Sequence, residues 1–279
     1  MTSALTSKLI RLDTTSDRAF LQLLSAIGGL YLLLLAAMLV ADVFAVKPAD
    51  FLYAMRSKDI RYAMQLSMFS CFVTATLSLL VSVPLAYVMS RVASGIWRHI
   101  FDALLDVPFV FPPVVVGLSL LLMFNTPLGH AIQRVIPFTY AVPGVILAQF
   151  VVACAFALRV MRSAMEAMPP RYEQVALTLG CSRAQAFLRI VLPYQRRAML
   201  AAFTLAWARA LGEFGPVMIF AGTIRMHTEV LPTSVYFELE QGTLGTSVAV
   251  ALLMIVFATL AMVAVRLAGM SAIGQKERG

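Results

Sequence analysis

The sequence predicts an all-α integral membrane protein with six transmembrane helices. Of its 279 residues, 61% are hydrophobic and only 13% are charged, whereas soluble domains are about 45–50% apolar. Four stretches lack charge over more than the roughly 18 positions that mark a membrane-spanning helix, because a hydrocarbon core of about 30 Å needs about 20 residues at helical rise. These stretches lie between residues 18 and 42, 61 and 91, 134 and 159, and 240 and 266.

Two further stretches complete the six helices, and both are less regular. One is interrupted early by Pro112 and Pro113, and the other contains Arg209 and Glu213. Both remain apolar enough to be read as spans once these breaks are allowed for. We therefore expect helices at about residues 20–44, 62–90, 107–124, 139–162, 198–222 and 244–267.

The basic residues indicate which side of the membrane each loop faces. Most of the 22 Lys and Arg residues fall in loops on the same side as both termini, and cytoplasmic loops are the ones enriched in such residues. The positive charge therefore reflects orientation in a membrane rather than binding to nucleic acid. It predicts a cytoplasmic N-terminus (1–19), a transmembrane domain (20–267) and a cytoplasmic tail (268–279).

The basic segment between the fourth and fifth helices, about residues 165–193, is predicted to contain two short helices. Pro169 and Pro170 suit the opening turn of the first helix, because proline has no N–H to leave unpaired there. Gly180 can end that helix in the left-handed conformation.

The second short helix has its own start and stop signals. Ser182 and Gln185 have the spacing of a capping box, which predicts that a helix starts there. We expect it to stop before Pro193. The segment is thus predicted as helix, glycine turn and helix.

This segment resembles the EAA loop of ATP-binding-cassette importer permeases, whose pattern is Glu-Ala-Ala, three residues, Gly, nine residues and Ile-x-Leu-Pro. The Gly, Ile, Leu and Pro positions match in register, whereas the first three read Gln174-Val175-Ala176, with a glutamate one place earlier. The resemblance implies a type I importer permease fold with a coupling loop that docks an ATPase subunit. Its candidate residues are Tyr172, Glu173, Gln174, Val175, Ala176, Gly180, Ile190, Leu192 and Pro193.

The amphipathic character of the first short helix fits this role. Tyr172, Val175 and Leu179 fall on roughly one helix face, and such an apolar face can enter a cleft of a soluble subunit. The surrounding arginines can pair with acidic groups of that subunit. Movement of the partner would then reach the bundle as rigid-body motion of the helix.

The fifth predicted helix carries an ionisable pair inside the apolar region. Arg209 and Glu213 are four residues apart, so they share a helix face and can neutralise each other. Two interpretations stay open. The pair is either a salt bridge that holds helices or subunits together, or it has a role in gating or in the translocation path. The gate and pathway candidates are Arg209, Gly212, Glu213, Gly215, Pro112 and Pro113.

Three strings resemble permeases of the molybdate, tungstate and sulfate class: ARALGEFG at 208–215, PPVVVG at 112–117 and PLG at 127–129. With the coupling loop, the resemblance covers about residues 62–267. It implies inward transport of a tetrahedral oxyanion such as molybdate, tungstate, sulfate or thiosulfate. A periplasmic or tethered substrate-binding protein would supply most of the specificity, and the alternative cargoes are a phosphonate or ferric iron.

The chain lacks the Gly-Lys-Ser/Thr loop with which many ATPases bind phosphate, since none of its four lysines follows a glycine. We therefore expect no catalytic site, metal site or cofactor on this chain, with ATP and Mg bound by a separate ATPase subunit. A second permease subunit, identical or paralogous, and membrane lipid are the other expected partners. The expected location is the inner membrane of a bacterial cell, with several membrane passes.

Two other classes of protein are less well supported. A secondary transporter or channel usually has coupling acids or polar residues lining its spans, whereas here the charges inside the spans are limited to Arg209 and Glu213. A membrane-embedded enzyme needs a catalytic cluster, and no His, Cys or acidic residues have suitable spacing.

Overall fold

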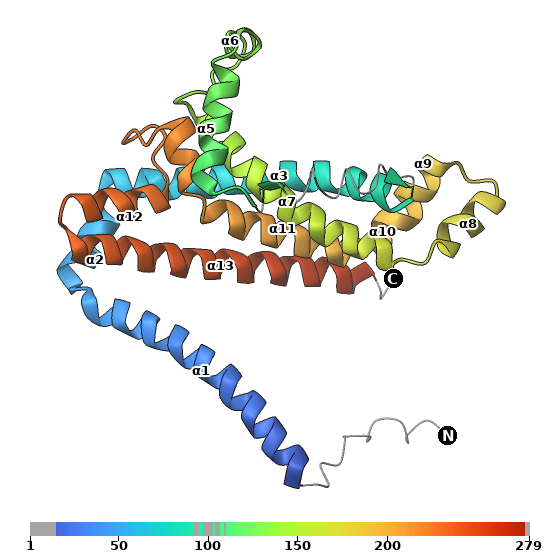
Figure 1. The fold of residues 1–279 in the computed structure, drawn as a ribbon, viewed down its shortest axis with the longest axis horizontal. Coiled ribbons are helices and arrows are strands. Elements are labelled where there is room, and N and C mark those ends of the chain that lie inside the picture. The colour runs from blue at the N-terminus through green and yellow to red at the C-terminus, as the bar shows by residue number, and fades with distance from the viewer. Residues whose placement is uncertain (1–14, 92–94, 97–102, 104–106, 109, 277–279) are drawn as a thin grey trace. The chain divides into compact units, whose positions relative to one another are not determined.

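The computed structural model describes residues 15–276 apart from 92–94, 97–102, 104–106 and 109, so residues 1–14 of the predicted N-terminus lie outside it. Every regular element within this part is a helix, which confirms the all-α class (Figure 1). The elements are α1 (Thr15–Ala45), α2 (Pro48–Arg56), α3 (Lys58–Arg91), α5 (Pro113–Phe124), α6 (Pro127–Gln133), α7 (Val142–Ala167), α8 (Arg171–Thr178), α9 (Arg183–Ala186), η1 (Phe187–Val191), α10 (Leu192–Tyr194), α11 (Arg196–Leu211), η2 (Val217–Ala221), α12 (Leu231–Glu240) and α13 (Leu244–Lys276).

The chain forms two compact units, residues 1–47 and residues 48–279. The first unit contains α1, whose apolar stretch Phe20–Ala45 is long enough to span a membrane. Three helical stretches of the second unit meet the same standard: Lys58–Arg91, Val142–Ala167 and Leu244–Val265. These four helices correspond to the four charge-free stretches of the sequence, which confirms that part of the prediction.

The third predicted helix is short and sharply bent. α5 begins at Pro113, directly after Pro112, and ends at Phe124 as expected. The chain then bends by 86° into α6, and only the two helices together are long enough to count as a span. Thr126 caps α6 by accepting a hydrogen bond from the Gly129 N–H at 3.2 Å, so the predicted turn contains a helix of its own.

α3, α7 and α11 pack against one another and form the centre of the second unit (Figure 1). Small, fully buried residues line their contacts, among them Ala75 and Ala86 of α3, Ala153 and Ala157 of α7, and Ala206 of α11. Small side chains let membrane helices approach closely, and packing is what holds such helices together in lipid. α13 packs against α11, α12 and α2.

The two ends of this bundle carry different short helices. α8, α9 and α10 lie at the end where α3 finishes and α11 begins, and α13 also finishes there (Figure 1). We call this the coupling end. α2 and α12 lie at the other end, which we call the outer end.

The fifth predicted helix is not continuous, which corrects the expectation of one span over residues 198–222. α11 stops at Leu211, residues 212–214 are not helical, and a π-helical turn, η2, follows from Val217. Glycine has a low helix propensity and proline cannot donate a backbone hydrogen bond, so Gly212 and Pro216 together break the helix.

The second short helix was expected to stop before Pro193, and this expectation is also wrong. After α9 the chain makes the π-helical turn η1, in which the Leu192 N–H donates to the Phe187 carbonyl, and α10 then passes through Pro193. Pro193 lies in the first turn of α10, where a residue without an N–H is tolerated. The break comes at Gln195, whose ψ of 3° separates α10 from α11.

α13 is longer than predicted. It runs through Lys276, so the predicted tail of residues 268–279 is helical for most of its length.

Candidate coupling site and gate

The first helix of the predicted coupling loop forms where the sequence places it. α8 starts after Pro170 and is closed by Gly180, whose φ is +87°. The Gly180 N–H donates to the Leu177 carbonyl at 3.1 Å and the Cys181 N–H donates to the Ala176 carbonyl at 3.0 Å. This pair of bonds is a Schellman motif, for which glycine is preferred because it adopts a positive φ without strain.

The capping box before α9 is also present. Ser182 Oγ accepts a hydrogen bond from the Gln185 N–H at 3.2 Å, and Gln185 Oε1 accepts one from the Ser182 N–H at 2.9 Å. The two bonds satisfy backbone donors that a helix start leaves unpaired. The predicted helix, glycine turn and helix are therefore confirmed.

α8 presents an apolar face to the exterior. Tyr172, Val175 and Leu179 are exposed, the last two to 57% and 79%. We call these three side chains the docking face. Ala176, one turn after Tyr172, is buried, and the Tyr172 ring lies 5.5 Å from the Tyr194 ring between centroids.

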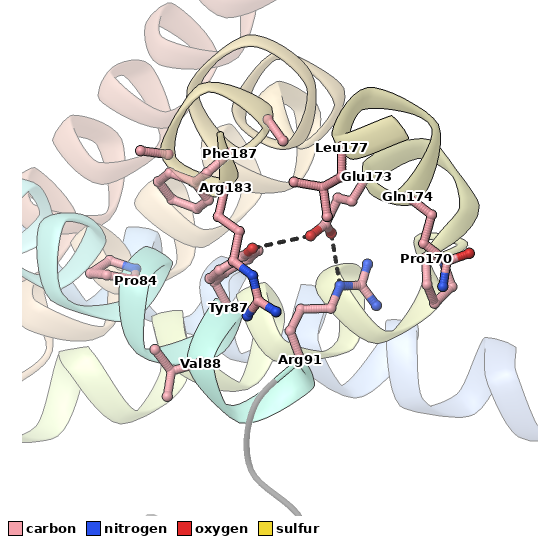
Figure 2. A pocket seen from close by; sticks show the side chains of 12 residues that line it. Pro84, Tyr87, Val88, Arg91, Pro170, Glu173, Gln174, Leu177, Arg183 and Phe187 are labelled. Carbon is pink, nitrogen blue, oxygen red and sulfur yellow. Dashed lines mark hydrogen bonds and ion pairs between the residues drawn. The ribbon is translucent and has the colours of Figure 1, made fainter. Parts of the chain in front are cut away.

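Glu173 points away from the docking face, into a polar cluster at the end of α3 (Figure 2). Its Oε1 lies 2.8 Å from Arg91 Nε, and its Oε2 accepts a hydrogen bond from the Tyr87 hydroxyl at 3.1 Å. Arg91 also donates from Nη2 to the Met168 carbonyl at 2.9 Å. The side chains of Arg91 and Glu173 are only 14% and 12% exposed, so this pair is better shielded from water than an ordinary surface salt bridge.

A cleft of about 570 Å³ opens beside this cluster, between the end of α3 and the α8–η1 segment (Figure 2). Its lining includes the polar residues Glu173, Arg91 and Arg183 and the apolar residues Leu177 and Phe187. The Tyr87 ring packs edge-on against the Phe187 ring at 4.8 Å between centroids.

The remaining coupling-loop candidates divide between surface and interior. Gln174 and Pro193 are exposed. Ile190 and Leu192 are partly buried and pack against the hydrophobic core that α3, α7 and α11 share. The Ile-x-Leu-Pro part of the motif therefore anchors the loop to the bundle.

The intramembrane pair forms within one stretch of chain, as its spacing predicts. Arg209 Nη1 lies 2.5 Å from Glu213 Oε1, and the Glu213 side chain is only 1% exposed. The Arg209 guanidinium also sits over the Phe156 ring of α7, 5.4 Å from its centroid. The pair thus lies where the broken fifth helix meets α7.

The structure brings together two gate motifs that are about a hundred residues apart in sequence. A Cβ atom added to Gly117 would lie 2.9 Å from Pro216 Cα, and one added to Gly215 would lie 3.1 Å from the Val114 N and 3.3 Å from Pro113 Cβ. Each glycine therefore permits backbone contact between α5 and the segment before η2.

Pro112 and Gly212 have other roles. Pro112 precedes α5 as its N-cap residue. A Cβ on Gly212 would meet nothing closer than 3.8 Å, so this glycine marks the helix break rather than a close contact.

Sequence reasoning missed an ionic cluster at the outer end. Arg225 lies 3.3 Å from Asp59 at the start of α3 and 3.3 Å from Glu238 of α12. Glu229 is buried nearby, where its Oε1 accepts a hydrogen bond from Ser234 Oγ at 2.8 Å. These residues share no spacing in the sequence that would have indicated a cluster.

Burial raises the pKa of Glu229 above its ordinary value of 4.5. Asp59 and Glu238 add to this increase in pKa, whereas the Ser234 hydrogen bond and the charge of Arg225 oppose it. The outer cluster therefore contains a carboxyl group that is harder to ionise than usual.

Two relatives indicate the group of proteins to which the sequence is related. The sulfate transport system permease protein CysT of Escherichia coli is 31% identical over 215 residues, which cover 76% of this chain and 77% of that protein. A probable molybdenum ABC transporter permease protein of Haloferax volcanii is 33% identical over 247 residues, which cover 87% of this chain and 88% of that protein.

The fold is similar to that of a solved transporter. It matches a chain from the crystal structure of a bacterial alginate ABC transporter in complex with alginate pentasaccharide-bound periplasmic protein, with a TM-score of 0.76 and 15% identity. The match covers 92% of this chain and 96% of that chain. It agrees with the predicted type I importer permease fold. Residues 82–269 fit one family model, and the chain therefore belongs to the family of binding-protein-dependent transport system inner membrane components.

Proposed function

We propose that this chain is the permease subunit of an ATP-binding-cassette importer that moves a tetrahedral oxyanion into the cell. The cargo is supported by the relatives, which are named for sulfate and for molybdenum, because sulfate and molybdate are both tetrahedral anions of the same charge. Specificity would lie mainly in a separate binding protein. The permease then needs a path without a deep binding well, since a tightly held anion would not leave.

The observation that carries the proposal is the docking face on α8. Three large side chains, Tyr172, Val175 and Leu179, are exposed on one short helix at the coupling end. A helix with one apolar face is the form in which a groove of a soluble partner recognises a helix. We assign this face to an ATPase subunit, which would bind ATP and Mg.

The remaining partners follow from the transport cycle. A second permease subunit, a further copy or a paralogue, would complete the path, and a periplasmic or tethered binding protein would deliver the anion. Both termini would lie in the cytoplasm, with the coupling end on that side of the bacterial inner membrane. Closure of the two ATPase subunits would move the α8 helices and shift the pair between inward-open and outward-open states.

The docking assignment is tested by placing a charge on the exposed face. Val175→Asp should weaken association with the ATPase subunit in detergent by about 30-fold or more, the loss of an interface hot spot of roughly 2 kcal/mol. Val135→Asp is the matched control, because Val135 is also an exposed valine but lies after α6, away from the coupling end. Equal association of both variants would overturn the docking assignment.

The cargo is tested by competition for uptake. Molybdate, tungstate, sulfate and thiosulfate are each offered in excess to cells that depend on this permease for one labelled oxyanion. We expect at least one of the others to compete, because they share shape and charge. Competition by a phosphonate or by ferric iron alone would overturn the oxyanion assignment.

A further inference from the structure

Glu173 and the docking face lie on the same short helix but point in different directions. Val175 and Leu179 are turned toward solvent, whereas the Glu173 carboxylate is bonded inside the chain to Arg91 and Tyr87 (Figure 2). A partner that covers the docking face would therefore leave this carboxylate in place. Glu173 therefore has a different role from the side chains of the docking face.

Arg91 joins three helices. It is the last residue of α3, its Nε contacts Glu173 in the first turn of α8, and its Nη2 binds the carbonyl of Met168 at the end of α7. A cation also suits the C-terminal end of α3, where the helix dipole is negative. The guanidinium has a planar fork of donors, so it can hold the two partners in a fixed geometry at once.

The contacts of Glu173 with Arg91 and Tyr87, which we call the link, connect α8 to α3 of the bundle core. The backbone of α8 packs chiefly against α9 and η1, which belong to the same loop. α3, by contrast, packs along α7 and α11 for much of its length. A displacement of α8 that pulls on Glu173 is therefore applied directly to the end of a core helix.

We propose that Arg91 and Glu173, supported by Tyr87, are positioning residues that transmit movement of α8 to α3, so that ATPase closure is converted into opening of the path. The proposal rests on the proposed function. Glu173 acts within the chain, and the docking face supplies the contact with the partner. Loss of the link should therefore separate two properties that loss of the docking face removes together: ATPase binding and transport per ATP.

The test uses the transporter assembled from this chain, its ATPase and its binding protein in liposomes. Uptake of labelled molybdate and of labelled sulfate is measured per ATP hydrolysed, alongside the amount of ATPase retained by the permease. In Glu173→Gln and in Arg91→Gln, ATPase retention should stay near that of the wild type. Uptake per ATP should fall at least about fivefold, the lower end of coupling between distant sites. Tyr87→Phe should have a smaller effect in the same direction.

A charge exchange separates transmission from simple damage to the fold. Arg91→Glu combined with Glu173→Arg restores an ion pair between the same helix ends, so uptake per ATP should recover above either single variant. Glu166→Gln is the matched control. It weakens the 3.1 Å contact between Glu166 and Arg162, which are four residues apart on α7, so uptake per ATP should change little.

Each remaining outcome decides against the proposal. Loss of ATPase retention in Glu173→Gln would mean that the carboxylate contacts the partner. Unchanged uptake per ATP in both single variants, or a double variant no better than the singles, would mean that the pair transmits nothing. A wild-type chain that neither retains an ATPase nor imports either anion would overturn the proposed function and this inference together.

Discussion

The Arg91–Glu173 pair and the Arg209–Glu213 pair have the same chemistry but join different things. The partners of the first are 82 residues apart and belong to α3 and α8, with Nε and Oε1 separated by 2.8 Å. The partners of the second are four residues apart, at the end of α11, with Nη1 and Oε1 separated by 2.5 Å. The first connects two helices, and the second neutralises charge across the break that ends α11.

This difference indicates what each pair contributes. Charges in an apolar chain are costly unless they are paired, so the local pair makes the broken fifth helix tolerable in the membrane. The long-range pair is less deeply buried than Glu213, so its contribution to stability is smaller. Its value lies in fixing the position of one helix relative to another.

The largest expected effect comes from breaking the local pair on one side. Arg209→Ala leaves the buried Glu213 carboxylate without its cation, which should lower the free energy of unfolding by about 3–5 kcal/mol. Denaturant titration in mixed micelles measures this loss. Replacement of both residues by Leu should cost much less, because no uncompensated charge remains. Equal losses for the single and double variants would show that burial of the Glu213 charge does not set the cost.

The surroundings of the local pair can be disturbed without changing any charge. Gly117→Ala places a methyl group 2.9 Å from Pro216 Cα, which should cost about 1–3 kcal/mol of unfolding free energy by overpacking. Gly212→Ala is the control, because its methyl group has space. A cost for Gly212→Ala as large as that for Gly117→Ala would contradict the close contact between α5 and η2.

The long-range pair should be measurable by a double-mutant cycle. Arg91→Ala, Glu173→Ala and their combination should give an interaction energy of about 1 kcal/mol, within the range for contacting residues. The same cycle on Arg162 and Glu166 should give about 0.3–0.5 kcal/mol, the value of an i,i+4 pair on a helix. Thermal unfolding in detergent reports both energies, and an interaction energy for Arg91 and Glu173 no larger than for the control pair would show that shielding adds nothing.

The smallest effect concerns pH at the outer end. The raised pKa of Glu229 means that the folded chain binds a proton more tightly than the unfolded chain. Stability should therefore fall as the pH rises from 4.5 to that raised pKa and should stay low above it. Glu229→Gln should lose this part of the pH dependence, which is measured as the difference in unfolding temperature between the two proteins across the pH series. Parallel curves would contradict the raised pKa.

Much of the coupling loop was predictable because its signals are local. Pro170, Gly180, Ser182 and Gln185 each act on backbone atoms within a few residues, so their spacing fixed the ends of α8 and the start of α9. The stop at Pro193 was predicted wrongly, because a π-helical turn with a Leu192 to Phe187 bond lets the helix pass through. Proline excludes one hydrogen bond, and its position in the first turn of α10 does not require that bond.

In the gate region, too, local features were predictable from the sequence and long-range contacts were not. The i,i+4 spacing was enough to predict that Arg209 and Glu213 meet. It did not predict that residues 212–214 are non-helical, nor that Gly117 and Gly215 let α5 and the segment before η2 touch. Those features depend on elements far apart in the chain.

The sequence by itself determined the all-α class, the four long apolar helices and the short helices of the coupling loop, because hydrophobic runs and capping residues act over short distances. Its short motifs also indicated the likeness to oxyanion permeases. Only the tertiary structure decided the partner of Glu173. No periodicity relates residue 91 to residue 173, and their contact arises from the packing of α3 against α7, which brings the end of one helix to the start of another. The glutamate that stood one place away from the family pattern is thus bonded to its own chain.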